Sequence, residues 1–135
     1  DNPYFNTFAG NPVSMAAAQA VLNYIRENAI LEHTRAMGEK LRAAVSDIAT
    51  RHPELAVVRG AGLFTGIEVV RPGTKEADRP FAVSLIEKLR ENHVLISLCG
   101  PYGNVLKVRP PLVFDDSDLD MFASALEASL SQLEA

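Results

Sequence analysis

Near its N-terminal end the chain carries a hydroxyl group close to a capped helix start. Thr7 supplies the hydroxyl, and Asn11 and Pro12 begin a helix. An asparagine side chain accepts hydrogen bonds from the N–H groups of the first helical turn. Proline is tolerated at the first helical position, because the N–H group that it lacks would have no partner within the helix. A helix start also attracts anions, because its dipole and free N–H groups point toward them. The segment is therefore either a phosphate-binding turn or a capped helix without a ligand.

Two cations alternate along a short apolar run near the other end of the chain. Lys107 and Arg109 are separated by one residue, and Pro110 and Pro111 end the run. Side chains two residues apart on a strand leave the same face, so the two charges lie side by side. Such a pair either binds an anion or protects an exposed edge strand from pairing with another chain. The spacing alone leaves both interpretations open.

Other groups of residues do not have the spacing of known sites. The glycines of residues 60–66 follow the pattern G-x-G-x-x-x-G and precede a strand, which excludes a dinucleotide-binding turn. The acidic run at residues 115–118 lacks the glycine and the closing glutamate of a calcium loop, so it predicts a helix cap. The histidines lack metal-ligand spacing and are expected to be surface or cap residues; they are His33, His52 and His93. We expect no metal site and no catalytic residue.

Hydrophobic periodicity predicts the elements that position the two candidate anion sites. Apolar residues at steps of three and four predict two opening helices, over residues 12–28 and 29–52. The later elements are predicted, in order, as strands 55–59 and 63–70, a helix over 81–92, strands 94–98 and 105–109, and a last helix capped by Asp115. This order predicts an α+β fold: long helical segments, then a small antiparallel or mixed sheet with helices on one face.

Composition narrows the possible partners and compartments. The 135 residues are 47% hydrophobic and 22% charged, with a net charge of −4, as expected of a globular protein. The basic residues are scattered, which argues against nucleic acid, and no apolar run is long enough for a bilayer. Cys99 is the single cysteine, so we expect no disulfide and a cytoplasmic, reducing location. A chain that begins with Asp1 is expected to be a piece of a longer protein.

The N-terminal motif also resembles one in a known family. Thr7-Phe8-Ala9-Gly10-Asn11-Pro12 is similar to the Thr-Phe-Gly-Gly-Asn-Pro motif of class III aminotransferases, which are pyridoxal-phosphate (PLP) enzymes of fold type I. Ala9 stands where the family has its first glycine. The resemblance implies PLP as cofactor and a homodimer in which Thr7 contacts the cofactor phosphate across the subunit interface.

Two further segments resemble the same family, in the same order along the chain. Residues 59–68 are similar to its Arg-Gly-x-Gly-Leu-x-x-Gly-Ile-Glu segment, and residues 105–112 to its Leu-Arg-x-x-Pro-Pro-Leu segment. The arginine of the latter binds the substrate carboxylate; here Lys107 holds that position and a cation follows at Arg109. The resemblance implies that these two residues bind the anionic end of an amine or amino acid substrate. Residues 100–107 resemble the branch that includes phosphoethanolamine phospho-lyase and alanine–glyoxylate aminotransferase 2-like proteins.

The resemblance implies that the chain is the C-terminal part of such an enzyme. Residues 1–28 would end the large domain, with the segment for the PLP phosphate, and residues 29–135 would form the small domain. The parent is expected to transfer an amino group from an amino acid or amine to a 2-oxo acid or aldehyde. Its Schiff-base lysine lies upstream, so this fragment alone is expected to be inactive. The alternatives are a phospho-lyase acting on a phosphorylated amine and a non-catalytic α+β ligand-binding or interaction module.

Overall fold

A computed structural model describes residues 3, 5–8 and 10–134 of the chain. The chain divides into two units, Asp1–His33 and Thr34–Ala135. Tyr4 and Ala9, which belong to the N-terminal motif, lie outside the described residues. The described elements are, in order, α1 (Pro12–Glu27), α2 (Ile30–Ala49), β1 (Leu55–Ala61), β2 (Phe64–Val69), α3 (Arg79–Glu91), β3 (Ser97–Cys99), β4 (Val105–Val108) and α4 (Asp116–Glu134).

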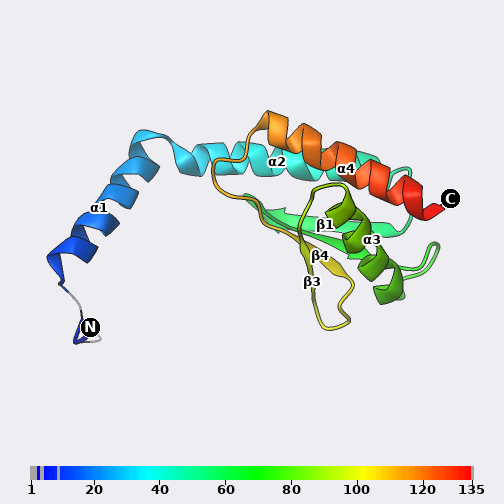
Figure 1. The fold of residues 1–135 in the computed structure, drawn as a ribbon, viewed down its shortest axis with the longest axis horizontal. Coiled ribbons are helices and arrows are strands. Elements are labelled where there is room, and N and C mark those ends of the chain that lie inside the picture. Colours follow the sequence, from blue (N-terminus) through cyan, green and yellow to red (C-terminus); the bar gives the residue numbers. More distant parts are fainter. Residues whose placement is uncertain (1–2, 4, 9, 135) are drawn as a thin grey trace. The chain divides into compact units, whose positions relative to one another are not determined.

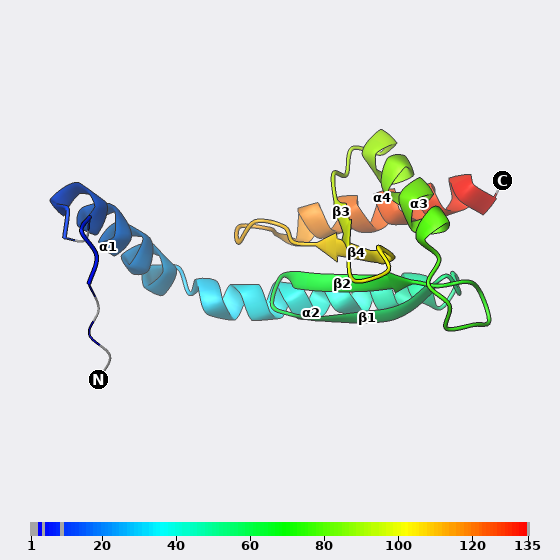
Figure 2. The same ribbon diagram turned by 90° about the horizontal axis from the view of Figure 1, so that it is seen from below.

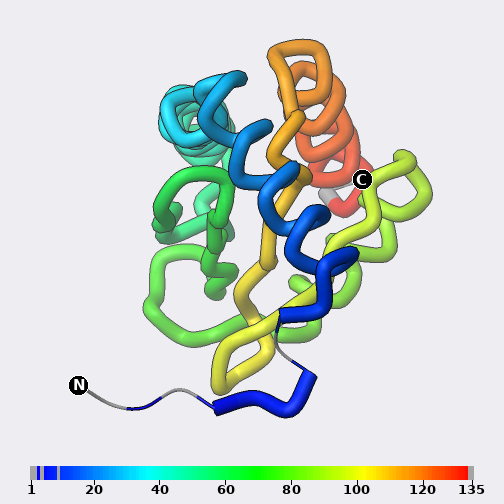
Figure 3. Tube along the Cα trace, turned by 90° about the vertical axis from the view of Figure 1, so that its left-hand side faces the viewer, coloured from blue at the N-terminus to red at the C-terminus, as the bar shows by residue number. Residues whose placement is uncertain are grey.

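The strands of the second unit form one antiparallel sheet in the order β1-β2-β4-β3. Its helices lie on one face of that sheet: α2 and α4 run above the strands in Figure 1, and the strands lie in front of them when seen from below in Figure 2. The end-on view of Figure 3 shows the same two layers. The predicted α+β fold with helices on one face is confirmed, and of the two sheet types left open, antiparallel or mixed, the sheet is antiparallel.

Alternation along β2 separates a buried face of the sheet from an open one. Thr65, Ile67 and Val69 are buried, whereas the residues between them are partly exposed. Ile67 pairs with Leu106 of β4, so Leu106 shares the buried face. The alternate residues of these strands, which include Lys107, therefore point to the open face of the sheet.

Three helices bury their apolar stripes against the sheet in one core. Leu41 of α2, Leu85 of α3 and Leu126 of α4 have no exposed surface. Burial of each such side chain contributes about 1.5–3 kcal/mol. An exposed ion pair from Lys40 to Asp116 links α2 to α4, and another joins Arg51, just after the end of α2, to Glu127 of α4. Each of these pairs contributes at most about 1 kcal/mol, so the apolar stripes determine the packing.

Helix α2 approaches the turn between β1 and β2 most closely at Gly38. A Cβ atom at Gly38 would lie 2.0 Å from the carbonyl oxygen of Gly62, which no real contact allows. Arg42, one turn further along α2, donates from Nη1 to the same oxygen at 2.8 Å. A glycine in the helix is therefore required by the close approach of the turn.

The β1–β2 turn differs from the sequence expectation. Residues 60–62 were expected to form it, but Ala61 pairs with Phe64, so the loop contains only Gly62 and Leu63. Gly62 has φ of 51°, which suits the first position of a tight hairpin turn. The third strand also begins later than expected, at Ser97 instead of residue 94, because only residues 97–99 pair with β4.

We predict that Gly38→Ala destabilises the protein. At an exposed helix position, alanine normally gives a helix that is about 1 kcal/mol more stable than glycine does. At position 38, however, the methyl group of alanine must displace the hairpin turn. The free energy of unfolding should fall by about 1–3 kcal/mol, measured by urea denaturation. Ser46→Ala, at an exposed position of the same helix, is the control and should change stability by less than about 0.5 kcal/mol. Unchanged or higher stability of Gly38→Ala would contradict the close approach.

Candidate functional site

The turn before α1 presents the Thr7 hydroxyl to solvent. Asn6 Oδ1 accepts a hydrogen bond from the Phe8 N–H at 3.0 Å, which closes a short turn around Thr7. Gly10 follows with φ of 83°, a left-handed conformation that glycine adopts without strain. Within the described part of the chain no hydrogen bond occupies the Thr7 hydroxyl, so it can donate to a phosphate oxygen.

The helix start itself offers little to an anion. Asn11 Oδ1 accepts from the N–H of Val13 at 2.9 Å and from that of Ser14 at 3.3 Å, which confirms the predicted cap. Pro12 has no N–H group, so the first turn is already largely satisfied. The described residues of this turn therefore fit a single contact to a phosphate, through the Thr7 hydroxyl.

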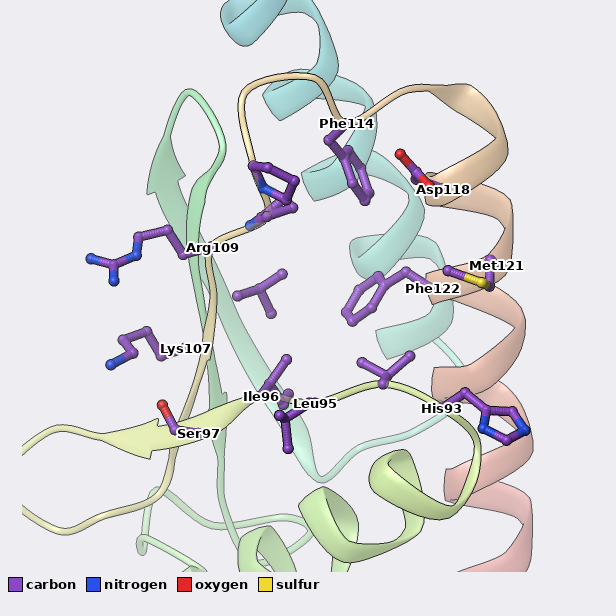
Figure 4. A pocket seen from close by; sticks show the side chains of 14 residues that line it. His93, Leu95, Ile96, Ser97, Lys107, Arg109, Phe114, Asp118, Met121 and Phe122 are labelled. Atoms are coloured by element: carbon purple, nitrogen blue, oxygen red, sulfur yellow. The ribbon is translucent and has the colours of Figure 1, made fainter.

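The spacing of Lys107 and Arg109 predicted a common face, and the structure places both side chains on the open side of the sheet. Lys107 is half-buried in β4, and Arg109 is exposed just after the strand ends. Both side chains point away from α4 in Figure 4. Among the described residues neither cation has a carboxylate within 4.0 Å. The two charges are therefore available to an anion.

Lys107 and Arg109 help to line the cavity in Figure 4, but their charged ends point away from its apolar lining. The cavity measures about 690 Å³, between the chain entering β3, the end of β4 and the start of α4. Its lining is mostly apolar and includes Leu95, Ile96, Pro110, Phe114, Met121 and Phe122. Because the charged ends of Lys107 and Arg109 point out of it, this cavity is not the predicted anion site.

A smaller cavity of about 310 Å³ opens on the same sheet face as the cations. It is lined by Arg59, Phe64, Gly66, Val105 and Lys107, among others. Sequence reasoning assigned the first three of these to a hairpin and gave Arg59 no role in binding. The signal that points to Arg59 is the strand register, in which Arg59 lies opposite Gly66, and Gly66 lies opposite Lys107.

Thr7 belongs to the first unit of the chain, whereas Lys107 and Arg109 belong to the second. The described residues contain no group of three metal-ligating side chains. None of the helices in the described part of the chain combines the length and the apolar character that crossing a bilayer requires.

Comparisons with known proteins agree with the motifs. The family model for class-III aminotransferases matches residues 4–130. Ethanolamine-phosphate phospho-lyase homolog 1 of Caenorhabditis elegans is 38% identical over 130 residues, which are 95% of this chain and 28% of that protein. A 5-aminovalerate aminotransferase of Pseudomonas putida is 33% identical over 127 residues, 94% of this chain and 30% of that protein.

A solved structure shares both fold and sequence with this chain. A phospholyase from Arthrobacter, in complex with phosphoethanolamine, is 44% identical with a TM-score of 0.89, over 96% of this chain and 31% of that one. The chain thus spans only 28 to 31% of the length of these relatives. It belongs to the class-III aminotransferase family of PLP-dependent enzymes, and it is a fragment of such a protein.

Proposed function

We propose that the parent protein transfers an amino group from an amine or amino acid to a 2-oxo acid or aldehyde, with PLP as cofactor. The observation that carries this proposal is the pair of cations on the open sheet face. Lys107 occupies the position at which the family motif has an arginine for the substrate anion, and Arg109 lies beside it on the same face. Class-III membership supports the cofactor and the reaction.

In this proposal the chain binds and orients, and it contributes no catalytic residue. When bound, PLP withdraws electrons from the substrate carbon that carries the amine. The Thr7 hydroxyl donates a hydrogen bond to a phosphate oxygen of the cofactor. The Lys107 ammonium and the Arg109 guanidinium attract the anionic end of the substrate, which directs its amine toward the cofactor.

Phosphate elimination from a phosphorylated amine is a second candidate, favoured by Lys107. Lysine cannot form the planar, bidentate pair with which arginine binds a carboxylate, but it binds phosphate well as a point charge. The names of two relatives, a phospho-lyase homolog and a phospholyase, point the same way. The third alternative, a non-catalytic module, gains no support from a family match that covers nearly the whole chain.

We also propose that residues 1–28 end the large domain, that residues 29–135 form the small domain, and that the parent is a cytoplasmic homodimer. Helix α1 has no buried residue, and its exposed side chains include Val13, Met15, Val21 and Leu22. An apolar helix surface of this kind favours burial against another domain or subunit. The single cysteine, Cys99, suits a reducing compartment.

The chain on its own should have no transaminase activity. Lys40 is paired with Asp116 at 2.6 Å and Lys88 with Glu91 at 2.8 Å, so neither ammonium is poised to react with a cofactor carbonyl. After incubation with PLP and reduction with borohydride, mass spectrometry should find no lysine labelled stoichiometrically. Full labelling of one lysine together with turnover would contradict the proposal.

In the full-length enzyme, Thr7→Ala should weaken PLP retention. The substitution removes one hydrogen bond to a charged phosphate, which corresponds to about 10- to 150-fold in affinity. Equilibrium dialysis of the holoenzyme measures this change. Thr7→Ser keeps the hydroxyl and should retain PLP like the unmodified enzyme; equal retention by Thr7→Ala would remove Thr7 from the site.

Lys107→Ala and Arg109→Ala should leave PLP bound but raise the KM of the full-length enzyme. Loss of one partly exposed contact to the substrate anion should raise KM by about three- to tenfold. Arg90→Ala, which removes an exposed arginine paired with Glu87 on α3, is the matched control and should not change KM. If neither strand variant changes KM, the two cations do not bind substrate; β4 pairs with β2 on one side and β3 on the other, so they do not protect an edge strand either.

A further inference from the structure

Four residues form one row across the open face of the sheet. The strand register places them side by side in the order Arg59, Gly66, Lys107, Ser97. Neighbouring strands lie about 4.7–4.9 Å apart, so the backbones of Arg59 and Lys107 are separated by about 9–10 Å. Gly66 lies between them and contributes no side chain. The row therefore has a notch over Gly66, with a long cationic side chain on each side.

The notch is part of the 310 Å³ cavity described above. Val105 contributes to its lining, and a Cβ atom at Gly66 would lie 3.2 Å from Val105 Cγ1. Any side chain at position 66 would therefore fill the notch. A volume of this size accommodates a small ligand.

Positive charge is concentrated at this notch in a chain whose net charge is −4. Arg59 Nη1 lies 2.6 Å from Glu68 Oε2, and this pair holds the guanidinium over the sheet. The other nitrogens of the Arg59 guanidinium have donors left for a ligand. Lys107 has no carboxylate partner among the described residues, so the notch carries an excess of positive charge.

We propose that the notch over Gly66 binds a phosphate group, with Arg59 and Lys107 contacting it from opposite sides. This inference rests on the proposed role of Lys107 in binding the substrate anion, and it adds Arg59 as a second ligand and Glu68 as its positioning residue. A tetrahedral phosphate presents oxygens in several directions and can accept from both cations at once. A planar carboxylate is better matched by the two parallel N–H groups of a single arginine. In this row the two cations lie on opposite sides of the notch instead.

Inorganic phosphate is the probe, and the PLP-loaded full-length enzyme is the protein to test, because its cofactor phosphate site is filled. Calorimetric titration at fixed ionic strength, in acetate buffer, gives the Kd and shows whether a carboxylate competes. Arg59→Gln and Lys107→Ala should each raise the Kd for phosphate by about five- to tenfold. Gly66→Ser, which fills the notch and keeps both charges, should weaken phosphate binding at least as much.

Arg71→Gln is the matched control, because Arg71 is an exposed arginine paired with Glu76 at 3.3 Å outside the notch. Its Kd for phosphate should be unchanged. Arg59→Lys keeps a charge at the position and should bind phosphate more tightly than Arg59→Gln, which separates binding from a general effect on folding. If acetate displaces phosphate at comparable concentration, the site is a carboxylate site and the proposal is overturned.

The outcomes separate this inference from the proposed function. If Lys107→Ala raises KM but Arg59→Gln leaves phosphate binding unchanged, the proposed function stands and the phosphate notch is refuted. If Arg59→Gln only lowers thermal stability, the Arg59–Glu68 pair is purely structural, which also refutes the phosphate notch. If both variants weaken phosphate binding while Lys107→Ala leaves KM unchanged, the notch is a phosphate site and the proposed substrate contact fails.

Discussion

The close contact between α2 and the β1–β2 hairpin depends on two glycines. Gly38 leaves room on the helix, and the carbonyl of Gly62 fills it and accepts a hydrogen bond from Arg42. A methyl group at position 38 would push the helix away from the turn. The contact therefore lets the apolar stripe of α2 lie close against the buried face of the hairpin.

The chemistry of the second unit lies on the face that the helices leave open. Strands alternate, so Leu106 and Val108 face the core while Lys107 between them faces away. A lysine on the buried face would need a partner to offset its loss of hydration, and the core around Leu106 is apolar. The same alternation that builds the core thus gathers Lys107, Arg59 and Glu68 on one surface.

The two candidate anion sites are built differently. Near Thr7 the backbone N–H groups of the helix start are already taken by Asn11, so a single hydroxyl is left to contact a phosphate. On the sheet, long cationic side chains surround a gap at Gly66. A neutral hydroxyl group contacts a bound phosphate only at hydrogen-bond distance. An unpaired cation attracts an anion over a longer distance. These properties match a tightly held cofactor and an exchanging substrate, which is how the proposed function uses them.

Sequence reasoning predicted the element order well, because periodicity and end signals are local. The Asn11 cap, the helix ends near Glu27 and Glu91, and the antiparallel pairing all agree with it. It predicted the hairpin turn at residues 60–62, whereas the loop contains only Gly62 and Leu63, because either glycine of residues 60–62 could have turned the chain. Only the pairing of Ala61 with Phe64 selects among them. The roles of Thr7, Lys107 and Arg109 stay predictions.

The sequence by itself determined the family, the α+β class and the common face of Lys107 and Arg109. Each follows from residue order or from a period of two along one strand. Only the tertiary structure decided that Arg59 lies across Gly66 from Lys107, since that neighbourhood joins three strands that are distant in the chain. It also decided that the charged ends of Lys107 and Arg109 point out of the larger cavity that these residues help to line. The register of β1 on β2 depends on which residues form the turn, and that of β2 on β4 joins segments far apart in the chain, so no single local pattern of residues encodes the whole row.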